Sequence, residues 1–161
     1  MDETNNISIK GNMRLQEGID LVRPSDLPRV LEVWEASVRA THLFLTEVDI
    51  QFFKPLVRDE LPHVEELACV RDEEGQVVGF VGVVDDKVEM LFIHPLWRLR
   101  GIGRRLLDYA VKTLGATRVD VNEQNEQAVG FYLQMGFEVE GRSEFDSMSK
   151  PFPLLHMRLD N

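Results

Sequence analysis

The stretch VEMLFIHPLWRLRGIGRRLL (residues 88–107) decides how this chain is expected to fold. Its first third is almost wholly apolar, which predicts a buried strand, and the amphipathic pattern that begins at Leu106 predicts a helix. Between them, residues 98–105 hold four arginines and two glycines. The first N–H groups of a helix have no intrahelical partner, so a glycine-rich entry into a helix suits an anion. The junction therefore predicts phosphate binding, in a chain whose net charge is −10.

The spacing of the glycines excludes two common phosphate-binding motifs. Leu106 stands where a dinucleotide-binding G-x-G-x-x-G motif needs its third glycine, and the Gly-Lys-Ser/Thr of a P-loop does not occur. Gly101 and Gly103 have no Cβ, so the backbone can approach an anion closely, and the nearby arginines can add charge-assisted hydrogen bonds. The alternative is a tight turn with solvated arginines at the start of a helix.

Outward from this junction, hydrophobic periodicity predicts further strands and helices. Strands are expected over residues 19–23, 66–71, 77–84, 88–93, 117–122, 137–144 and 153–159. Helices are expected from Ser25 as N-cap, over 46–61 with a break or kink at Pro55, over 102–115, and over 126–135 with Gly136 as C-cap. This order predicts an α+β fold in three layers, a mixed sheet with helices on its faces. Residues 19–161 are expected to form one domain after a mobile polar extension, residues 1–18.

The composition excludes several classes of protein. A chain with a net charge of −10 is not expected to bind nucleic acid or an anionic membrane surface, and no apolar run is long enough to span a bilayer. The N-terminus lacks the pattern of a signal peptide, so we expect a cytoplasmic protein. Cys69 is the only cysteine, which rules out a disulfide within the chain, and we expect it in the core. The histidines have no metal-ligand spacing, so no metal is expected.

A second motif, NEQNEQAVGFYLQMGF (residues 122–137), lies on the next strand–helix unit. Arg-x-x-Gly-x-Gly from Arg98, and Asn-x-x-Ala-x-x-Phe-Tyr-x-x-x-Gly-Phe from Asn125, resemble two motifs of the GNAT superfamily of acetyl-coenzyme A-dependent N-acetyltransferases. The resemblance covers about residues 19–160. It implies a largely antiparallel sheet of about seven strands that splays in the middle, with acetyl-coenzyme A (acetyl-CoA) in the gap.

The resemblance also implies which residues bind the cofactor. Its pyrophosphate would lie on the backbone N–H groups of Arg98, Leu99, Arg100, Gly101, Ile102, Gly103, Arg104 and Arg105. Arg98 and Arg104 are the expected side-chain contacts, while Arg100 and Arg105 would neutralise the phosphates from nearby. The pantetheine arm and the acetyl carbonyl would pair with the backbone of Leu91, Phe92 and Ile93.

Two residues of the second motif are expected to take part in the reaction. Asn125 would position the pantetheine arm, and its alternative is a plain helix N-cap. Tyr132 would act as the general acid that protonates the departing thiolate, and its alternative is a core tyrosine.

No motif fixes the general base or the acceptor site. Glu89 is a carboxylate inside an apolar strand, where an unpaired charge is costly to bury, so we expect it to be the base. A carboxylate paired with an arginine, or one that reaches solvent, is the alternative. The resemblance implies that the acceptor is bound by the first two helices and by the loop that joins the last two strands. The candidate acceptor-binding residues are His42, Phe44 and Glu89. His42 is alternatively a capping or surface group.

The predicted activity is transfer of an acetyl group from acetyl-CoA directly to a primary amine of a small molecule, a peptide or a protein. No covalent acyl-enzyme is expected. The alternatives are a non-catalytic acetyl-CoA-binding regulatory module and a nucleotide-binding protein that uses the same glycines. The sequence is compatible with a monomer or a homodimer.

Overall fold

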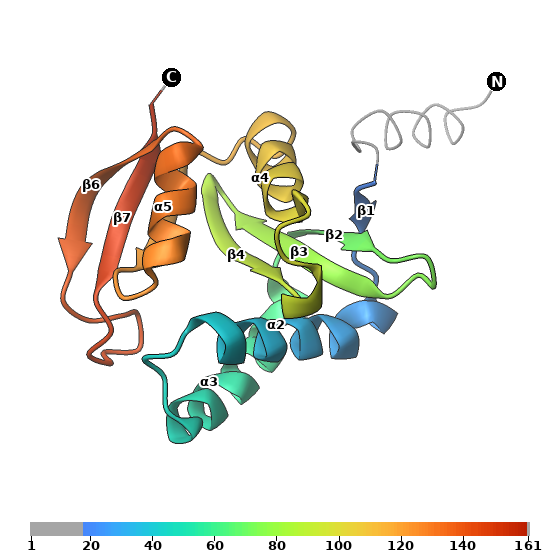
Figure 1. Ribbon diagram of the computed structural model, residues 1–161, viewed down its shortest axis with the longest axis horizontal. Coiled ribbons are helices and arrows are strands. Elements are labelled where there is room, and N and C mark those ends of the chain that lie inside the picture. Colours follow the sequence, from blue (N-terminus) through green and yellow to red (C-terminus); the bar gives the residue numbers. More distant parts are fainter. Residues whose placement is uncertain (1–17, 161) are drawn as a thin grey trace.

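The computed structural model describes residues 18–160. In this range, seven strands form one sheet in the order β1-β2-β3-β4-β5-β7-β6. Figure 1 shows the sheet with β1 at one end and β6 at the other. The strands are β1 (Asp20–Leu21), β2 (Glu66–Arg71), β3 (Val77–Val84), β4 (Lys87–Ile93), β5 (Arg118–Asn122), β6 (Phe137–Ser143) and β7 (Leu154–Leu159). Neighbouring strands are antiparallel except for β4 and β5, which are parallel.

Four α-helices and three short 3-10 turns connect these strands within the described range. They are η1 (Pro24–Asp26), α2 (Leu27–Thr41), α3 (Glu47–Glu60), η2 (Leu61–His63), η3 (Pro95–Trp97), α4 (Ile102–Lys112) and α5 (Glu126–Gln134). In Figure 1, α4 lies on one side of β3 and β4, and α2 and α3 lie on the other. The predicted α+β fold, with a mixed, largely antiparallel sheet and helices on both faces, is confirmed.

Strand β3 explains why its sequence, VVGFVGVV, is apolar without interruption. Val78, Val81 and Val83 belong to the core under α4 and α5, whereas Val77 and Phe80 belong to the core under α2 and α3. A strand that is covered on both faces has no position that favours a polar side chain. The two cores therefore sandwich the middle of the sheet.

A β-bulge at Glu89 opens the sheet beside β4. Val88 pairs with Val83 and Met90 pairs with Gly82, which leaves Glu89 as an extra residue without a partner on β3. Val88 lies in the core on the α4 side and Met90 in the core on the α2 side, so the bulge changes which face each following residue occupies. On its other edge, β4 pairs with β5 only through Lys87 and Val88. The predicted splay in the middle of the sheet is thus confirmed, and it begins at the bulge.

A row of polar side chains connects β4 to β5, β7 and β6 next to the point where β4 and β5 separate. Lys87 on β4 forms an ion pair with Asp120 on β5 at 2.7 Å. The Asp120 carboxylate also contacts Nδ1 of His156 on β7, and Nε2 of His156 contacts Oγ of Ser143 on β6, each at 2.7 Å. These contacts cross four strands where the backbone pairing of β4 and β5 ends.

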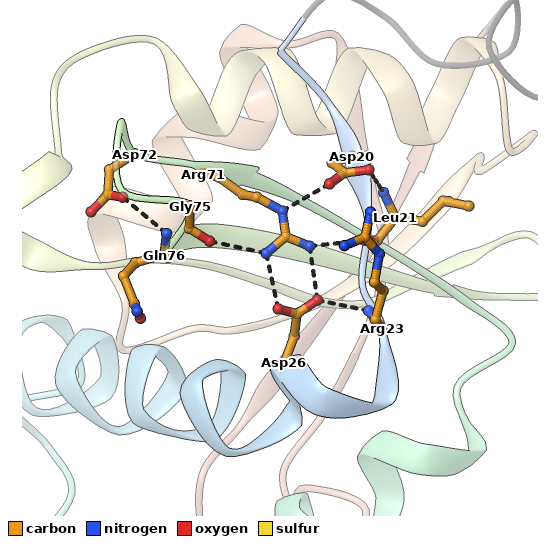
Figure 2. A network of polar contacts seen from close by, with 8 residues as sticks. All are labelled: Asp20, Leu21, Arg23, Asp26, Arg71, Asp72, Gly75 and Gln76. Atoms are coloured by element: carbon orange, nitrogen blue, oxygen red, sulfur yellow. Dashed lines mark hydrogen bonds and ion pairs between the residues drawn. The ribbon is translucent and has the colours of Figure 1, made fainter.

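A second polar network, drawn in Figure 2, fixes the start of α2 against the edge of the sheet. The Arg71 guanidinium on β2 donates to the carboxylate of Asp20 on β1 at 2.8 Å and to both carboxylate oxygens of Asp26 at 2.9 and 2.8 Å. It also donates to the carbonyl oxygens of Leu21 and Gly75. One guanidinium thus holds β1, β2 and η1 together, and α2 begins directly after η1.

Two predicted details of the helices are wrong. Ser25 is not an N-cap, because it lies inside η1, where the Asp26 carboxylate instead accepts the N–H of Arg23 at 2.8 Å. Of the break or kink predicted at Pro55, the break does not occur, because α3 continues from Glu47 to Glu60 with Pro55 inside it. Proline removes the N–H that would bond to the carbonyl of Gln51, but Gln51 is exposed, so water can satisfy that carbonyl.

The predicted extension over residues 1–18 lies outside the described residues, apart from Gly18. Between residues 18 and 160, no helix has both the length and the apolar character needed to cross a bilayer.

Candidate functional site

A pocket of about 330 Å³ lies where β4 separates from β5. Its walls come from the end of β4, from the loop before α4 and the first turn of α4, from one face of α5 and from the last turn of α2. The predicted site residues that line it are His42, Leu91, Phe92, Ile93, Arg98, Leu99, Gly101, Ile102, Gly103, Arg104, Asn125 and Tyr132. The fold therefore brings most of the predicted cofactor residues to one cavity. Four others, Phe44, Glu89, Arg100 and Arg105, are not part of its lining.

The N-terminus of α4 forms one end of this pocket and offers backbone groups that suit an anion. The first intrahelical hydrogen bond runs from the N–H of Arg105 to the carbonyl of Gly101 at 3.1 Å. The N–H groups of Ile102, Gly103 and Arg104 precede it and have no acceptor within the helix. Gly101 has a φ of +79°, in the left-handed region that glycine adopts without a steric penalty. Three backbone donors and the positive end of the helix dipole thus converge at the pocket.

The arginines of this junction divide into two groups. Arg98 and Arg104 line the pocket. Arg100 stacks its guanidinium on the Trp97 ring, 4.6 Å from the centroid. Arg105 packs against the N-terminal edge of the described chain, since a Cβ at Gly18 would lie only 1.7 Å from its Nη2. Two of the four side chains therefore face the pocket, and the other two contribute charge from outside it.

Asn125 is the N-cap of α5 as well as a pocket residue. Its side-chain oxygen accepts the N–H of Ala128 at 3.2 Å. The cap therefore occupies the oxygen, while the amide NH₂ of the same side chain makes no hydrogen bond within the described part of the chain and can donate to a ligand.

Tyr132 has a buried ring and an accessible hydroxyl. Its residue exposure is 6%, and its ring packs edge-on against Phe131 and Phe137, with centroids 5.1 and 5.5 Å apart. The hydroxyl has no hydrogen-bond partner in residues 18–160, and no fully buried side-chain oxygen there lacks one, so the hydroxyl keeps some accessible surface in a residue that lines the pocket. Burial raises the pKa of Tyr132, so the phenol keeps its proton at neutral pH.

Glu89 and Phe44 lie outside the pocket for different reasons. Glu89 is exposed at the bulge, and its carboxylate forms no ion pair with a described residue. Partial burial raises its pKa, and the charge of Lys87 opposes this shift. Phe44 packs against His42 and Phe152, with ring centroids 5.4 and 5.7 Å apart, and is not a lining residue itself.

Six lining residues were not predicted: Ser37, Thr41, Trp97, Gln127, Ala128 and Phe131. Ser37 and Thr41 are four residues apart on α2, a spacing that puts two polar side chains on one helix face and was visible in the sequence. Trp97 directly precedes the first motif, and Gln127 is a variable position inside the second. No spacing rule could have selected them.

The comparisons with known proteins agree with this geometry. A family model described as acetyltransferase (GNAT) domain matches residues 65–139. The peptidyl-lysine N-acetyltransferase YjaB of Escherichia coli strain K12 is 41% identical over 151 residues, which cover 94% of this chain and 95% of that protein. This chain belongs to the GNAT family. The acetyltransferase is similar to the solution structure of apo-form YjaB from E. coli, with a TM-score of 0.80 and 40% identity over 87% of this chain and 95% of that one.

The fold is shared more widely than the sequence. The crystal structure of the PaiA N-acetyltransferase from Thermoplasma acidophilum in complex with coenzyme A has a TM-score of 0.68 at 20% identity, covering 88% of this chain and 98% of that one. The protein is therefore an acyltransferase that transfers an acetyl group to an amine.

Proposed function

We propose that this acetyltransferase binds acetyl-CoA in the pocket beside β4 and transfers the acetyl group directly to the side-chain amine of a lysine in a peptide or protein. The lysine acceptor is proposed from its relative in E. coli, which is named a peptidyl-lysine N-acetyltransferase. Binding of coenzyme A is supported by the likeness to the T. acidophilum complex and by the chemistry of the pocket.

The pocket fits the cofactor at both ends. The N–H groups of Ile102, Gly103 and Arg104, with the guanidiniums of Arg98 and Arg104, suit the charged pyrophosphate. Toward β4 the lining becomes apolar and suits the uncharged pantetheine arm, with Leu91, Ile93 and Phe131. The amide of Asn125 lies beside this apolar part and can donate to an amide carbonyl of the arm.

The observation that carries the proposal is the Tyr132 hydroxyl. It is a protonated phenol without a partner in residues 18–160, and it belongs to a residue that lines the pocket beside the apolar side chains of Leu91, Ile93 and Phe131. When an amine attacks the thioester carbonyl, the C–S bond breaks and the sulfur needs a proton. We propose that Tyr132 supplies this proton as general acid.

The test is acetylation of a peptide with a blocked N-terminus and a single lysine, followed by release of the thiol and by mass spectrometry. We expect turnover by the wild-type protein and a loss of kcat of roughly 10²–10⁴-fold for Tyr132→Phe, the usual effect of removing a general acid. Because the hydroxyl has no protein partner, this variant should keep both its stability and its affinity for acetyl-CoA. Tight binding of acetyl-CoA without turnover on lysine peptides or small amines would favour a non-catalytic binding module instead.

A further inference from the structure

His42 lies in the same pocket as Tyr132 but comes from the opposite side of the sheet. It ends α2, and its backbone N–H still bonds to the carbonyl of Val38 at 2.8 Å. Its ring lines the pocket and lies against Phe44 in the following loop and Phe92 on β4, with ring centroids 5.4 and 6.3 Å apart. The capping role of His42 therefore belongs to its backbone, which leaves the imidazole for the pocket.

Hydrogen bonds on α2 decide which imidazole nitrogen carries the proton. The Thr41 hydroxyl donates its single proton to the carbonyl oxygen of Ser37 at 2.8 Å. At the contact of 2.9 Å between Thr41 Oγ1 and His42 Nδ1, the hydroxyl oxygen can then only accept. The neutral ring consequently holds its proton on Nδ1 and has a free lone pair on Nε2.

Nε2 is accessible from the pocket. It has no hydrogen-bond partner in residues 18–160, and no fully buried side-chain nitrogen in that range lacks one. The groups around the ring, Thr41, Phe44 and Phe92, carry no charge, and burial alone lowers the pKa of His42 to about 4. The imidazole is therefore a neutral acceptor of protons at physiological pH, and the same apolar surroundings lower the pKa of an amine that enters.

We propose that His42, rather than Glu89, is the general base that accepts the proton of the attacking amine at Nε2, and that Thr41 is the positioning residue that fixes its tautomer. This inference rests on the proposed function. In the step, the amine nitrogen forms the C–N bond to the acetyl carbonyl carbon and loses its proton to Nε2. The C–S bond breaks, and the sulfur takes the proton of the Tyr132 hydroxyl. The imidazolium proton then returns to the tyrosinate through solvent, which restores both residues.

Glu89 provides the matched comparison, because its carboxylate is on β4, the strand that lines the pocket, but lies outside the pocket. With the single-lysine peptide and acetyl-CoA, His42→Ala should lose roughly 10²–10⁴-fold in kcat, with an unchanged acetyl-CoA dissociation constant. Free imidazole should restore part of the rate to His42→Ala but none to Tyr132→Phe. Glu89→Gln should keep the wild-type kcat.

Conservative substitutions at His42 and Thr41 test the same assignment if His42→Ala is poorly folded. His42→Asn retains a donor toward Thr41 but has no base, so it should be as slow as His42→Ala while binding acetyl-CoA. Thr41→Val should lose roughly three- to tenfold in kcat, the usual effect of one hydrogen bond, and Thr41→Ser should restore it.

A wild-type rate in His42→Asn, or a loss of rate in Glu89→Gln alone, would overturn the assignment of the base while leaving the acetyltransferase function in place. Absence of turnover by the wild-type protein on every amine would instead contradict the proposed function itself.

Discussion

The Arg98 guanidinium donates a hydrogen bond to the side-chain carbonyl of Gln127, which joins the loop before α4 to the first turn of α5. Both residues line the pocket. The two sequence motifs of the family are thereby linked by a side-chain contact across the site. The contact also orients the guanidinium on the side of the pocket where the phosphates are proposed to bind.

This contact predicts a graded effect on cofactor affinity. Arg98→Ala removes a charged donor, so its acetyl-CoA dissociation constant should rise about tenfold or more, the effect of losing a hydrogen bond to a charged group. Gln127→Ala leaves the Arg98 charge in place but removes the contact that orients the guanidinium. Its dissociation constant for acetyl-CoA should rise only about two- to fivefold. Isothermal titration with acetyl-CoA measures both. Wild-type affinity in Arg98→Ala would show that this guanidinium does not contact the phosphates.

Gly103 predicts a difference between two substitutions at one position. A Cβ there would meet Phe131 at 3.7 Å, an ordinary contact, so Gly103→Ala should fold and bind acetyl-CoA nearly as the wild type does. Gly103→Glu introduces a negative charge beside the free N–H groups of α4 and should abolish measurable binding at micromolar concentrations. Titrations of both proteins, with circular dichroism to verify folding, check this. Unchanged affinity for acetyl-CoA in Gly103→Glu would show that the pyrophosphate does not bind at the N-terminus of α4.

The burial of Cys69 predicts that the acetyl group is not transferred through this thiol. The residue is fully buried, and burial raises the pKa of its thiol to about 11, so almost no thiolate exists at neutral pH. Cys69→Ala should therefore keep the wild-type kcat, at a cost of about 1 kcal/mol in stability from the lost packing. A thiol reagent should modify the wild-type protein only after denaturation. An acetylated Cys69 in mass spectra taken during turnover would contradict direct transfer.

Arg71 predicts how stability depends on pH. Its hydrogen bonds lower the pKa of Asp26 to about 2, and a lowered folded-state pKa contributes stability above the unfolded value near pH 4 that is lost as pH falls toward 2. Arg71→Met should lower the free energy of unfolding by about 2 kcal/mol at pH 7. The gap between variant and wild type should narrow as the pH is lowered to about 2.5. Urea denaturation at both pH values measures this.

Arg58→Met is the matched control, because Arg58 forms an exposed ion pair with Asp59 on α3, with side-chain exposures of 62% and 71%. It should leave stability unchanged at both pH values. A gap between Arg71→Met and wild type that does not depend on pH would assign the effect of Arg71 to packing rather than to its carboxylate partners.

Local sequence features predicted those parts of the molecule that depend on local physics. The strands and helices followed from hydrophobic periodicity. The predicted C-cap of α5 is wrong by one residue, because Met135 is the cap and Gly136, with a φ of +97°, follows it directly. The errors came from interactions that the pattern does not contain. Ser25 lost its capping role because Arg71, far along the chain, binds Asp26 and stabilises η1 in front of α2.

The sequence by itself determined the proposed anion-binding end of the site, because free N–H groups, a left-handed glycine and adjacent arginines are properties of one continuous segment, residues 98–105. Only the tertiary structure decided which groups meet the proposed cofactor on its other side. The bulge places Glu89 on the exposed surface instead of in the site, since one extra residue shifts the faces of a strand. The packing of α2 against β4 brings His42 into the cavity, and such a contact between distant segments leaves no periodic signal in the chain.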